Sequence, residues 1–240
     1  MGSEARKTNL HRGPDFIRRW FCGRVLDIGC GDDPVVPHAE PFDRAQGDAR
    51  RILETLSPES WDVVHSSHCL EHMDDVEDAL RQWWALVRPG GTMILVVPDE
   101  ILYEQGTWPS IFNLEHKASF RLGGATSPLP ASFELRELLM GLPDAEIVDI
   151  AVQDAGYDHS LRRRIGPFQR RLYRFSVWRA AAMRRFLGDN RATALSDLLL
   201  YRIERLLGRP VDQTGERGRA ALAQIQAIIR KEKPLSASAA

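Results

Sequence analysis

The chain has 240 residues, of which 43% are hydrophobic and 27% are charged, and its formal net charge is −1. This composition is typical of a globular protein, and the length predicts a single domain over residues 1–240. No apolar run approaches the roughly 20 residues of a membrane-spanning helix, and no signal segment opens the chain. Three widely spaced cysteines exclude both a disulfide framework and a four-cysteine zinc site. These exclusions predict a cytoplasmic protein.

The charge is distributed unevenly along the chain. Residues 160–210 contain thirteen arginines, no lysine and only three acids, so this segment carries +10 and the remainder carries −11. Such an imbalance indicates a local anionic partner or surface rather than a generally basic protein.

Apolar periodicity predicts alternating strands and helices along most of the chain. The first strand ends abruptly in Gly29, as expected of a buried parallel strand that leads into a tight turn. A later helix is stopped by glycines at positions 90 and 91, and Ser132 is the expected cap of the next one. The alternation predicts a doubly wound α/β sheet. Strands are predicted at residues 24–28, 39–43, 61–65, 92–97, 145–152 and 220–230, and helices at residues 1–22, 74–87 and 132–140.

Residues 160–211 are predicted to form an Arg-rich helical hairpin inserted between the last two strands. Gly188 ends the first helix and Asn190 can cap the second. Each helix has an apolar stripe that we expect to be buried, with arginines on the opposite face. The stripes consist of Phe168, Leu172, Phe175, Trp178, Ala182 and Phe186, then Ala192, Leu195, Leu199, Ile203 and Leu206; the arginines are Arg170, Arg171, Arg174, Arg184 and Arg185.

The strongest motif lies where the first strand ends, at residues 25–33 (VLDIGCGDD). Glycines at the end of a strand allow a ligand to approach the backbone closely. Pro34 stands in place of the third glycine of the dinucleotide fingerprint, so the motif does not provide for a pyrophosphate. The run resembles the first motif of the class I S-adenosylmethionine-dependent methyltransferases, whose cofactor has a cationic sulfur and an ammonium group.

The resemblance implies which residues hold the cofactor. Its amino-acid portion would lie over Gly29 and Gly31, with Cys30 between them and Asp27 close to the ammonium group. The acid for the ribose hydroxyls would be Asp43, with Glu40 as the alternative. The remaining positions are Asp48 and Ala49 near the adenine amine, and Ser66 after the fourth strand of the family. Only twelve residues separate Gly31 from Asp43 and five separate Asp43 from Asp48, so the early helices must be trimmed or missing.

Two further segments support the same resemblance. Residues 61–72 (WDVVHSSHCLEH) and 86–94 (LVRPGGTMI) resemble a later strand with its Leu-Glu-His helix start and the helix-Pro-Gly-Gly-strand unit of the same family. The resemblance covers residues 24–98 well, and residues 130–152 and 218–231 loosely. It implies a Rossmann-like sheet with a final antiparallel strand.

The loop at residues 99–129 is expected to enclose the acceptor, because long loops at the carboxyl edge of a sheet are where sites are built. Methyl transfer to a hydroxyl needs removal of a proton, and His116 and His68 are the candidate bases. These histidines could instead join Glu104 or Glu115 around a metal. No pair of ligands has the spacing of a metal motif, however, so no metal is predicted.

The predicted function is O-methylation of a small-molecule or sugar-containing acceptor. An RNA methyltransferase that uses the hairpin as a phosphate grip and a cofactor-binding but inactive partner subunit are the alternatives. No Asn/Asp-Pro-Pro-aromatic motif follows residues 61–65, which speaks against an adenine or amide nitrogen as the acceptor. The hairpin itself is either a solvated face or a docking surface for anionic lipid at the inner membrane face, a phosphorylated glycan carrier or nucleic acid.

Overall fold

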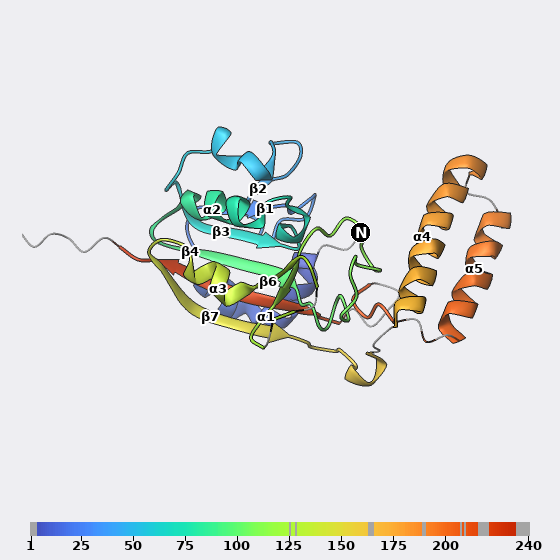
Figure 1. The fold of residues 1–240 in the computed structure, drawn as a ribbon. Coiled ribbons are helices and arrows are strands. Elements are labelled where there is room, and N and C mark those ends of the chain that lie inside the picture. Colours follow the sequence, from blue (N-terminus) through green and yellow to red (C-terminus); the bar gives the residue numbers. More distant parts are fainter. Residues whose placement is uncertain are drawn as a thin grey trace, which may run out of the picture.

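The computed structural model describes residues 4–124, 126–127, 129–162, 166–188, 191–206, 208, 210–215 and 221–233. A six-stranded mixed sheet forms its centre, and a two-stranded parallel sheet lies beside it (Figure 1). The strands are β1 (Val25–Ile28), β2 (Glu40–Phe42), β3 (Trp61–Ser67), β4 (Val87–Pro98), β5 (Ser119–Arg121), β6 (Ser132–Glu134), β7 (Ala145–Gln153) and β8 (Gln224–Lys231). The α-helices are α1 (Glu4–Trp20), α2 (Val76–Leu86), α3 (Leu135–Met140), α4 (Pro167–Leu187) and α5 (Arg191–Leu206), with 3-10 helices η1 (Ala49–Glu54), η2 (Leu70–His72) and η3 (His159–Leu161).

The order of the large sheet is β2-β1-β3-β4-β8-β7. The first four strands are mutually parallel, and β8 runs antiparallel to both of its neighbours. The prediction of a Rossmann-like α/β fold with a final antiparallel strand is therefore confirmed. Because β1, β2, β3 and β4 are parallel, the loops that follow them meet at one edge of the sheet, where ligands bind in folds of this kind.

Helices cover both faces of the sheet. On one face, Trp83 and Trp84 of α2 and Leu139 of α3 are fully buried in the main core. On the other face, Ala5 of α1 packs with Val25 and other aliphatic side chains of the strands. The first crossover helices are trimmed as predicted, since no α-helix lies between β1 and β2 and only η1 lies between β2 and β3 among the described residues.

The segment at residues 132–140 differs from its prediction. Residues Ser132–Glu134 form β6, which pairs in parallel with β5, and α3 begins only at Leu135. The N-cap is Glu134, whose carboxylate accepts a hydrogen bond from the backbone N of Glu137 at 2.7 Å. Ser132 is not the cap, because its hydroxyl donates to Glu100 instead.

The helical hairpin consists of α4 and α5 and stands beyond the edge toward which β3 and β4 point (Figure 1). Its contact with the loop at residues 99–129 is made by Tyr173, which is buried against Ile111. In the described part of the chain no helix is long and apolar enough to cross a bilayer.

The prediction that the apolar stripes of the hairpin are buried is wrong. Trp178 is 67% exposed, Phe186 is 81% exposed and Leu206 is 88% exposed. The reason is geometric: two helices that extend from the body can cover part of each other, but no third surface formed by the described residues covers the rest of their apolar area. Other exposed members are Phe168, Phe175, Leu195, Leu199 and Ile203. The side chains of Arg170, Arg174, Arg184 and Ala192 lie outside the described residues.

Candidate functional site

A cavity of about 970 Å³ lies at the carboxyl edge of the sheet. It is bordered by the loops that follow β1, β2 and β3 and by the segment at residues 114–117. This cavity is lined by four of the residues that the resemblance assigns to the cofactor. One of the two predicted catalytic bases also lines it. The lining residues include Gly29, Asp43, Asp48, Ala49, His68, Cys69, His72, Leu114, Glu115 and Lys117.

Gly29 lines the floor of the cavity, and only a residue without a side chain fits there beside Cys69. Its φ is +77°, and a Cβ atom added to it would lie 2.6 Å from the sulfur of Cys69. Its backbone N donates to the carbonyl of Phe42 at 2.8 Å, and the backbone N of Gly31 donates to the Asp43 carboxylate at 2.9 Å. The loop after β1 is therefore fixed to the end of β2, and a side chain at position 29 would displace it.

Asp27 lies beneath this loop, and the cavity lining does not include it. Its two carboxylate oxygens accept hydrogen bonds from the backbone N of Val35 and from Nδ1 of His65, both at 2.6 Å. Burial lowers the pKa of His65 despite the neighbouring Asp27, so the ring stays neutral and donates from Nδ1. The pair ties β1 to β3 under the glycines, and this is the role of Asp27 that the contacts support.

Cys30 and Ser66 also lie outside the cavity lining. The Ser66 hydroxyl donates to the carbonyl of Ile28 at 3.1 Å, in the buried sheet. Burial, with the charges of Asp27 and Asp43, raises the pKa of the Cys30 thiol to about 11. Cys30 therefore remains a neutral thiol at physiological pH and is not a nucleophile.

Asp48 and Ala49 line the cavity at the start of η1. Asp48 caps η1 and pairs with Arg50, and the hydrogen bonds from Arg50 lower the pKa of this carboxyl to about 2. The Ala49 carbonyl accepts a hydrogen bond from the indole of Trp83 at 2.8 Å, which fixes η1 to α2. This segment is thus held rigidly without a crossover helix.

His116 is buried and does not itself line the cavity, although its neighbours Glu115 and Lys117 do. Its Nδ1 lies 2.7 Å from a carboxylate oxygen of Glu104, and Tyr103 stacks on its ring at 5.2 Å between centroids. The backbone N atoms of the two residues that follow His116 donate to the carbonyl of Glu71, at 2.7 and 3.1 Å. These hydrogen bonds fix the ring of His116 beside η2.

Glu71 connects both predicted bases. Its side chain is fully buried, and neither carboxylate oxygen accepts a hydrogen bond; Nδ1 of His68 and Nε2 of His116 lie 3.4 and 3.9 Å from Oε1. Burial acts to raise its pKa, but His68, His116 and His72 outweigh burial and the pKa is lowered. Glu71 is therefore an ionised carboxylate inside a ring of three imidazoles.

His68 occupies the other side of Glu71. Its Nε2 lies 3.0 Å from the side-chain oxygen of Gln224, and burial opposes its protonation. The contacts with Glu71 and Glu4 prevail, so the pKa of His68 is raised. A raised pKa favours the protonated form of His68, which cannot accept a proton, and His116, with Glu104 at its Nδ1, is the other candidate base.

Sequence analysis selected neither Glu71 nor His72 as a site residue. Nδ1 of His72 lies 3.1 Å from the carbonyl of Glu115, and its ring meets that of His116 edge to face at 5.0 Å. The sequence feature that could have identified Glu71 and His72 is their position just after β3, at the carboxyl edge of the sheet, where functional side chains gather.

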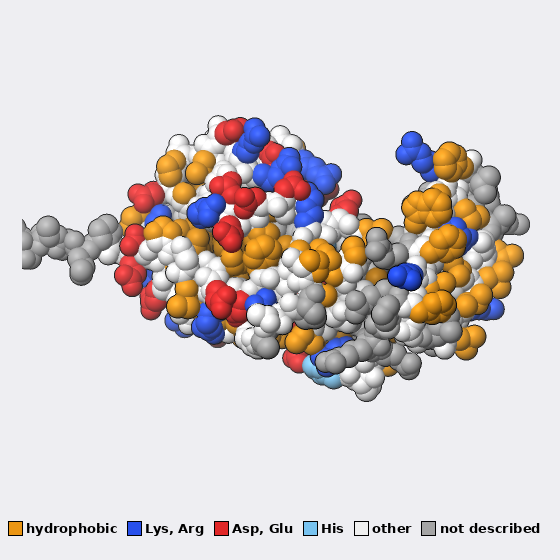
Figure 2. Space-filling model, in the orientation of Figure 1, with side chains coloured by type: hydrophobic (Ala, Val, Ile, Leu, Met, Phe, Trp, Pro, Cys, Tyr) orange, Lys and Arg blue, Asp and Glu red, His pale blue; other side chains and the backbone are white. Residues whose placement is uncertain are grey.

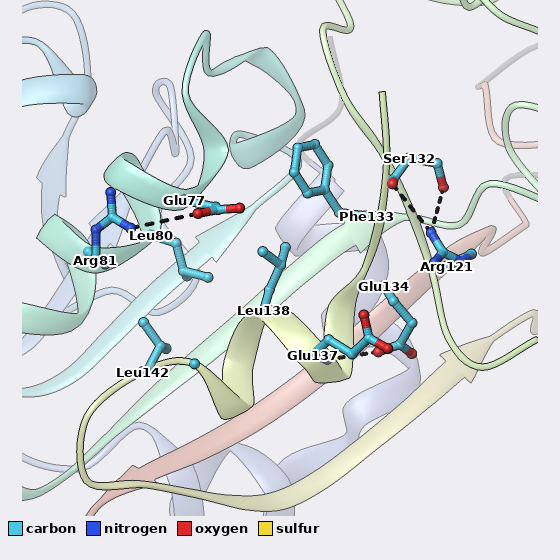
Figure 3. A pocket seen from close by; sticks show the side chains of 11 residues that line it. Glu77, Leu80, Arg81, Arg121, Ser132, Phe133, Glu134, Glu137, Leu138 and Leu142 are labelled. Atoms are coloured by element: carbon cyan, nitrogen blue, oxygen red, sulfur yellow. Dashed lines mark hydrogen bonds and ion pairs between the residues drawn. The ribbon is translucent and has the colours of Figure 1, made fainter. Parts of the chain in front are cut away.

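A second cavity, of about 370 Å³, lies between α2, β6 and α3 (Figure 3). Its charged groups are satisfied locally, for example Glu77 by Arg81 at 3.7 Å. None of the predicted site residues lines it, and it has no carboxylate or imidazole without a partner among the described residues. The carboxyl-edge cavity is therefore the candidate site.

The residues that line this cavity all lie in the part of the chain that matches a known family. Residues 13–122, which include β1 to β5, match the family model of a methyltransferase domain. No curated protein matches the sequence. Among solved structures, the YcgJ protein from Bacillus subtilis is 12% identical, with a TM-score of 0.50 over 95% of this chain and 100% of that chain. A SAM-dependent methyltransferase from Archaeoglobus fulgidus is 17% identical, with a TM-score of 0.45 over 95% of this chain and 94% of that chain. The first likeness supports the fold.

Proposed function

Residues 13–122 are a class I S-adenosylmethionine-dependent methyltransferase domain, and from this premise we propose that the protein methylates a hydroxyl oxygen of a small-molecule or sugar-containing acceptor. S-adenosylmethionine is the methyl donor. In the reaction the sulfur–carbon bond breaks with its electron pair left on sulfur, a carbon–oxygen bond forms, and the hydroxyl proton is lost.

The pair of Glu104 and His116 is the observation that carries this proposal. A hydroxyl needs help to lose its proton, and a buried imidazole oriented by a carboxylate provides such help. Glu104 lies 2.7 Å from Nδ1 of His116, so Nε2 is the nitrogen that remains for the acceptor side. Tyr103 and His72 pack on the ring and hold its orientation.

We place the cofactor over Gly29 and Gly31, with Asp43 at the ribose and Asp48 with Ala49 at the adenine. The support is that Gly29, Asp43, Asp48 and Ala49 line one cavity, together with His68 and His72. A volume of about 970 Å³ is at the upper end of ligand sites and leaves room for an acceptor beside the cofactor. We assign structural roles to Asp27 and Ser66, and a loop position to Cys30.

Transfer of an isotope-labelled methyl group tests the acceptor chemistry. With labelled S-adenosylmethionine and a panel of hydroxylated sugars, phenols and amines, we expect labelled methyl ethers and no labelled amines. Mass spectrometry and carbon NMR of the product distinguish an O-methyl from an N-methyl group. A product labelled on nitrogen would refute the hydroxyl acceptor.

We further propose that the hairpin docks the protein on an anionic lipid surface, as a peripheral enzyme at the inner membrane face. Aromatic side chains of α4 and aliphatic side chains of α5 stay in contact with solvent (Figure 2). Arg171 and Arg185 are exposed and lie seven residues before and after Trp178, so in the helix they border the aromatic stripe rather than occupy the opposite face as predicted. An apolar face bordered by arginines suits the boundary between anionic headgroups and acyl chains. Large apolar side chains are not what a phosphate grip on RNA requires.

The contact between Tyr173 and Ile111 connects the hairpin to the loop that we expect to enclose the acceptor. Ile111 belongs to the loop that also positions His116, so the hairpin would bring this loop close to the lipid surface. An acceptor presented at a membrane, such as a glycan on a phosphorylated lipid carrier, fits that arrangement.

Co-sedimentation with lipid vesicles tests the docking. We expect binding to vesicles that contain phosphatidylglycerol and little binding to pure phosphatidylcholine. Paired replacement of Trp178 and Phe186 by serine is expected to weaken binding by about tenfold or more, because each buried aromatic contributes about 1.5–3 kcal/mol. Charge reversal of Arg171 and Arg185 should weaken it by a similar factor, since each arginine near the surface contributes about 1 kcal/mol.

Matched controls come from α3, where Met140 and Arg136 are both exposed. Met140→Ser and Arg136→Glu remove the same kinds of groups from the body and should leave vesicle binding unchanged. Equal binding to both kinds of vesicle, or equal loss in the α3 variants, would contradict docking through the hairpin.

A further inference from the structure

Three side chains with metal-binding atoms meet beside the cavity: Glu71, His72 and His116. One ligand atom from each lies within 4.8 Å of the other two. Glu71 and His72 belong to η2, and His116 is fixed beside them by the backbone hydrogen bonds to the Glu71 carbonyl. The cluster therefore does not depend on flexible side chains from distant loops.

Glu71 is the feature that ordinary packing does not explain. Its carboxylate is fully buried, and neither oxygen accepts a hydrogen bond. Burial of an ionised group is costly unless it is paired or coordinates a cation. The nearest imidazole nitrogens, of His68 and His116, lie 3.4 and 3.9 Å from Oε1 without forming a hydrogen bond, so a cation held between these groups would supply the partner that this carboxylate lacks.

Nε2 of His116 lies 3.9 Å from Oε1 of Glu71, and in both histidines an oxygen atom lies near Nδ1. Nδ1 of His116 lies 2.7 Å from Glu104, and Nδ1 of His72 lies 3.1 Å from the carbonyl of Glu115. An oxygen at Nδ1 fixes the proton on that nitrogen and leaves the lone pair of Nε2 for a ligand. Such outer oxygen partners accompany metal-binding histidines in proteins.

We infer that Glu71, His72 and His116 form a binding site for a divalent transition-metal ion. Two imidazoles and one carboxylate suit Zn²⁺, Co²⁺ or Mn²⁺ better than Mg²⁺, which prefers an all-oxygen shell. Bonds of about 2.0–2.2 Å place the ligand atoms of a tetrahedral site roughly 3.3 Å apart. The three ligand atoms lie within 4.8 Å of one another, so binding of an ion would draw them closer together.

Three protein ligands leave a position open for substrate. Because His72 also lines the cavity with Gly29 and Asp43, an acceptor oxygen can reach this position from the cavity. The role of the ion in catalysis rests on the proposed function. A bound ion lowers the pKa of the acceptor hydroxyl, whose proton then leaves to water, and the resulting oxygen anion attacks the methyl group. His116 then acts as a ligand that is oriented by Glu104.

Metal titration of the full chain tests the site without any substrate. After treatment with a chelator, the protein is titrated with Zn²⁺ by calorimetry and with Co²⁺ by visible absorption. We expect one ion per chain and a Co²⁺ spectrum of low coordination number. Glu71→Gln, which preserves shape, and His116→Ala should each weaken binding by about 100-fold or more, while Glu104→Gln should weaken it by about 10- to 100-fold.

Two controls make the result specific. His159→Ala removes an exposed histidine that pairs with Asp154, and it should leave binding unchanged. Serine at both Cys30 and Cys69 should also leave binding unchanged, which excludes a thiolate site. Binding that survives Glu71→Gln but is lost in the cysteine variant would overturn the inference, as would a folded wild-type protein that binds neither ion.

The catalytic role is measured separately. Methyl transfer that stops on chelation and returns with Zn²⁺ or Co²⁺ would support the ion as the activator of the acceptor. Full transfer in the metal-free protein would overturn that role while leaving the proposed methyltransferase function intact. Stoichiometric metal binding without any O-methyl product would refute the proposed function and leave the metal site standing.

Discussion

Replacement of His116 by alanine is expected to lower turnover by about 10²- to 10⁴-fold while the affinity for S-adenosylmethionine changes by less than about twofold. The reason is that His116 does not line the cavity in which the cofactor is placed but lies between Glu104 and Glu71, where we propose that it promotes loss of the acceptor proton. Single-turnover transfer of a labelled methyl group gives the rate, and calorimetry gives the affinity.

Glu104→Gln is expected to have a smaller effect on turnover than His116→Ala. Glutamine can still accept a hydrogen bond from Nδ1 of His116, but it removes the negative charge that favours the active form of the ring. Its rate should therefore lie between those of the wild type and His116→Ala. A full-rate His116→Ala variant would refute the role of this residue, and parallel losses of rate and cofactor affinity would indicate a collapsed site instead.

A methyl group at position 29 is expected to weaken binding of S-adenosylmethionine by roughly 10- to 100-fold, which corresponds to about 1.4–2.7 kcal/mol. In Gly29→Ala the new Cβ would lie 2.6 Å from the Cys69 sulfur, and the residue would also hold a φ of +77° that alanine disfavours. The loop must therefore move away from β3, and with it the floor of the cavity.

Gly13→Ala is the matched control. Gly13 has a similar φ of +71°, but an added Cβ would meet nothing within 4 Å. This variant also places alanine at a positive φ, but Gly13 does not line the cavity, so the variant should retain full cofactor affinity despite loss of thermal stability. Equal affinities of Gly29→Ala and the wild type would show that the cofactor does not lie over this loop.

Much of the fold was predictable because its signals are local. The apolar run before Gly29, the helical spacing of residues 76–86 and the glycines at positions 90 and 91 each specify one element without reference to the rest. The shortening of the first two crossover connections was predicted from the small number of residues between Gly31 and Asp48. In the same way, β8 was recognised from alternating aliphatic residues in the last part of the chain.

The errors arose where a local pattern has two physical outcomes. An aromatic stripe at helical spacing indicates a face that avoids water, but only the tertiary structure decides whether the protein itself covers it, and Trp178 and Phe186 remain exposed. Ser132 is a good capping residue, yet pairing with Ser119 in β5 places it in a strand, and Glu134 caps the helix.

The candidate site was predictable only in part. His116 and His68 could be selected by residue type and by their place after strands, but their meeting at Glu71 joins residues more than 40 positions apart. That contact depends on how the loop after β4 folds back to the Glu71 carbonyl, which no periodicity encodes. Glu71 itself was overlooked because an acid at a helix start usually has a capping role in solvent.

Calorimetric titration of the purified chain with S-adenosylmethionine and its demethylated product S-adenosylhomocysteine tests the account most directly. The account predicts that both bind at one site per chain, and that both lose affinity in Gly29→Ala and retain it in His116→Ala. If neither compound bound to the folded protein, the carboxyl-edge cavity would not be a cofactor site, and the assignment of its residues would be wrong.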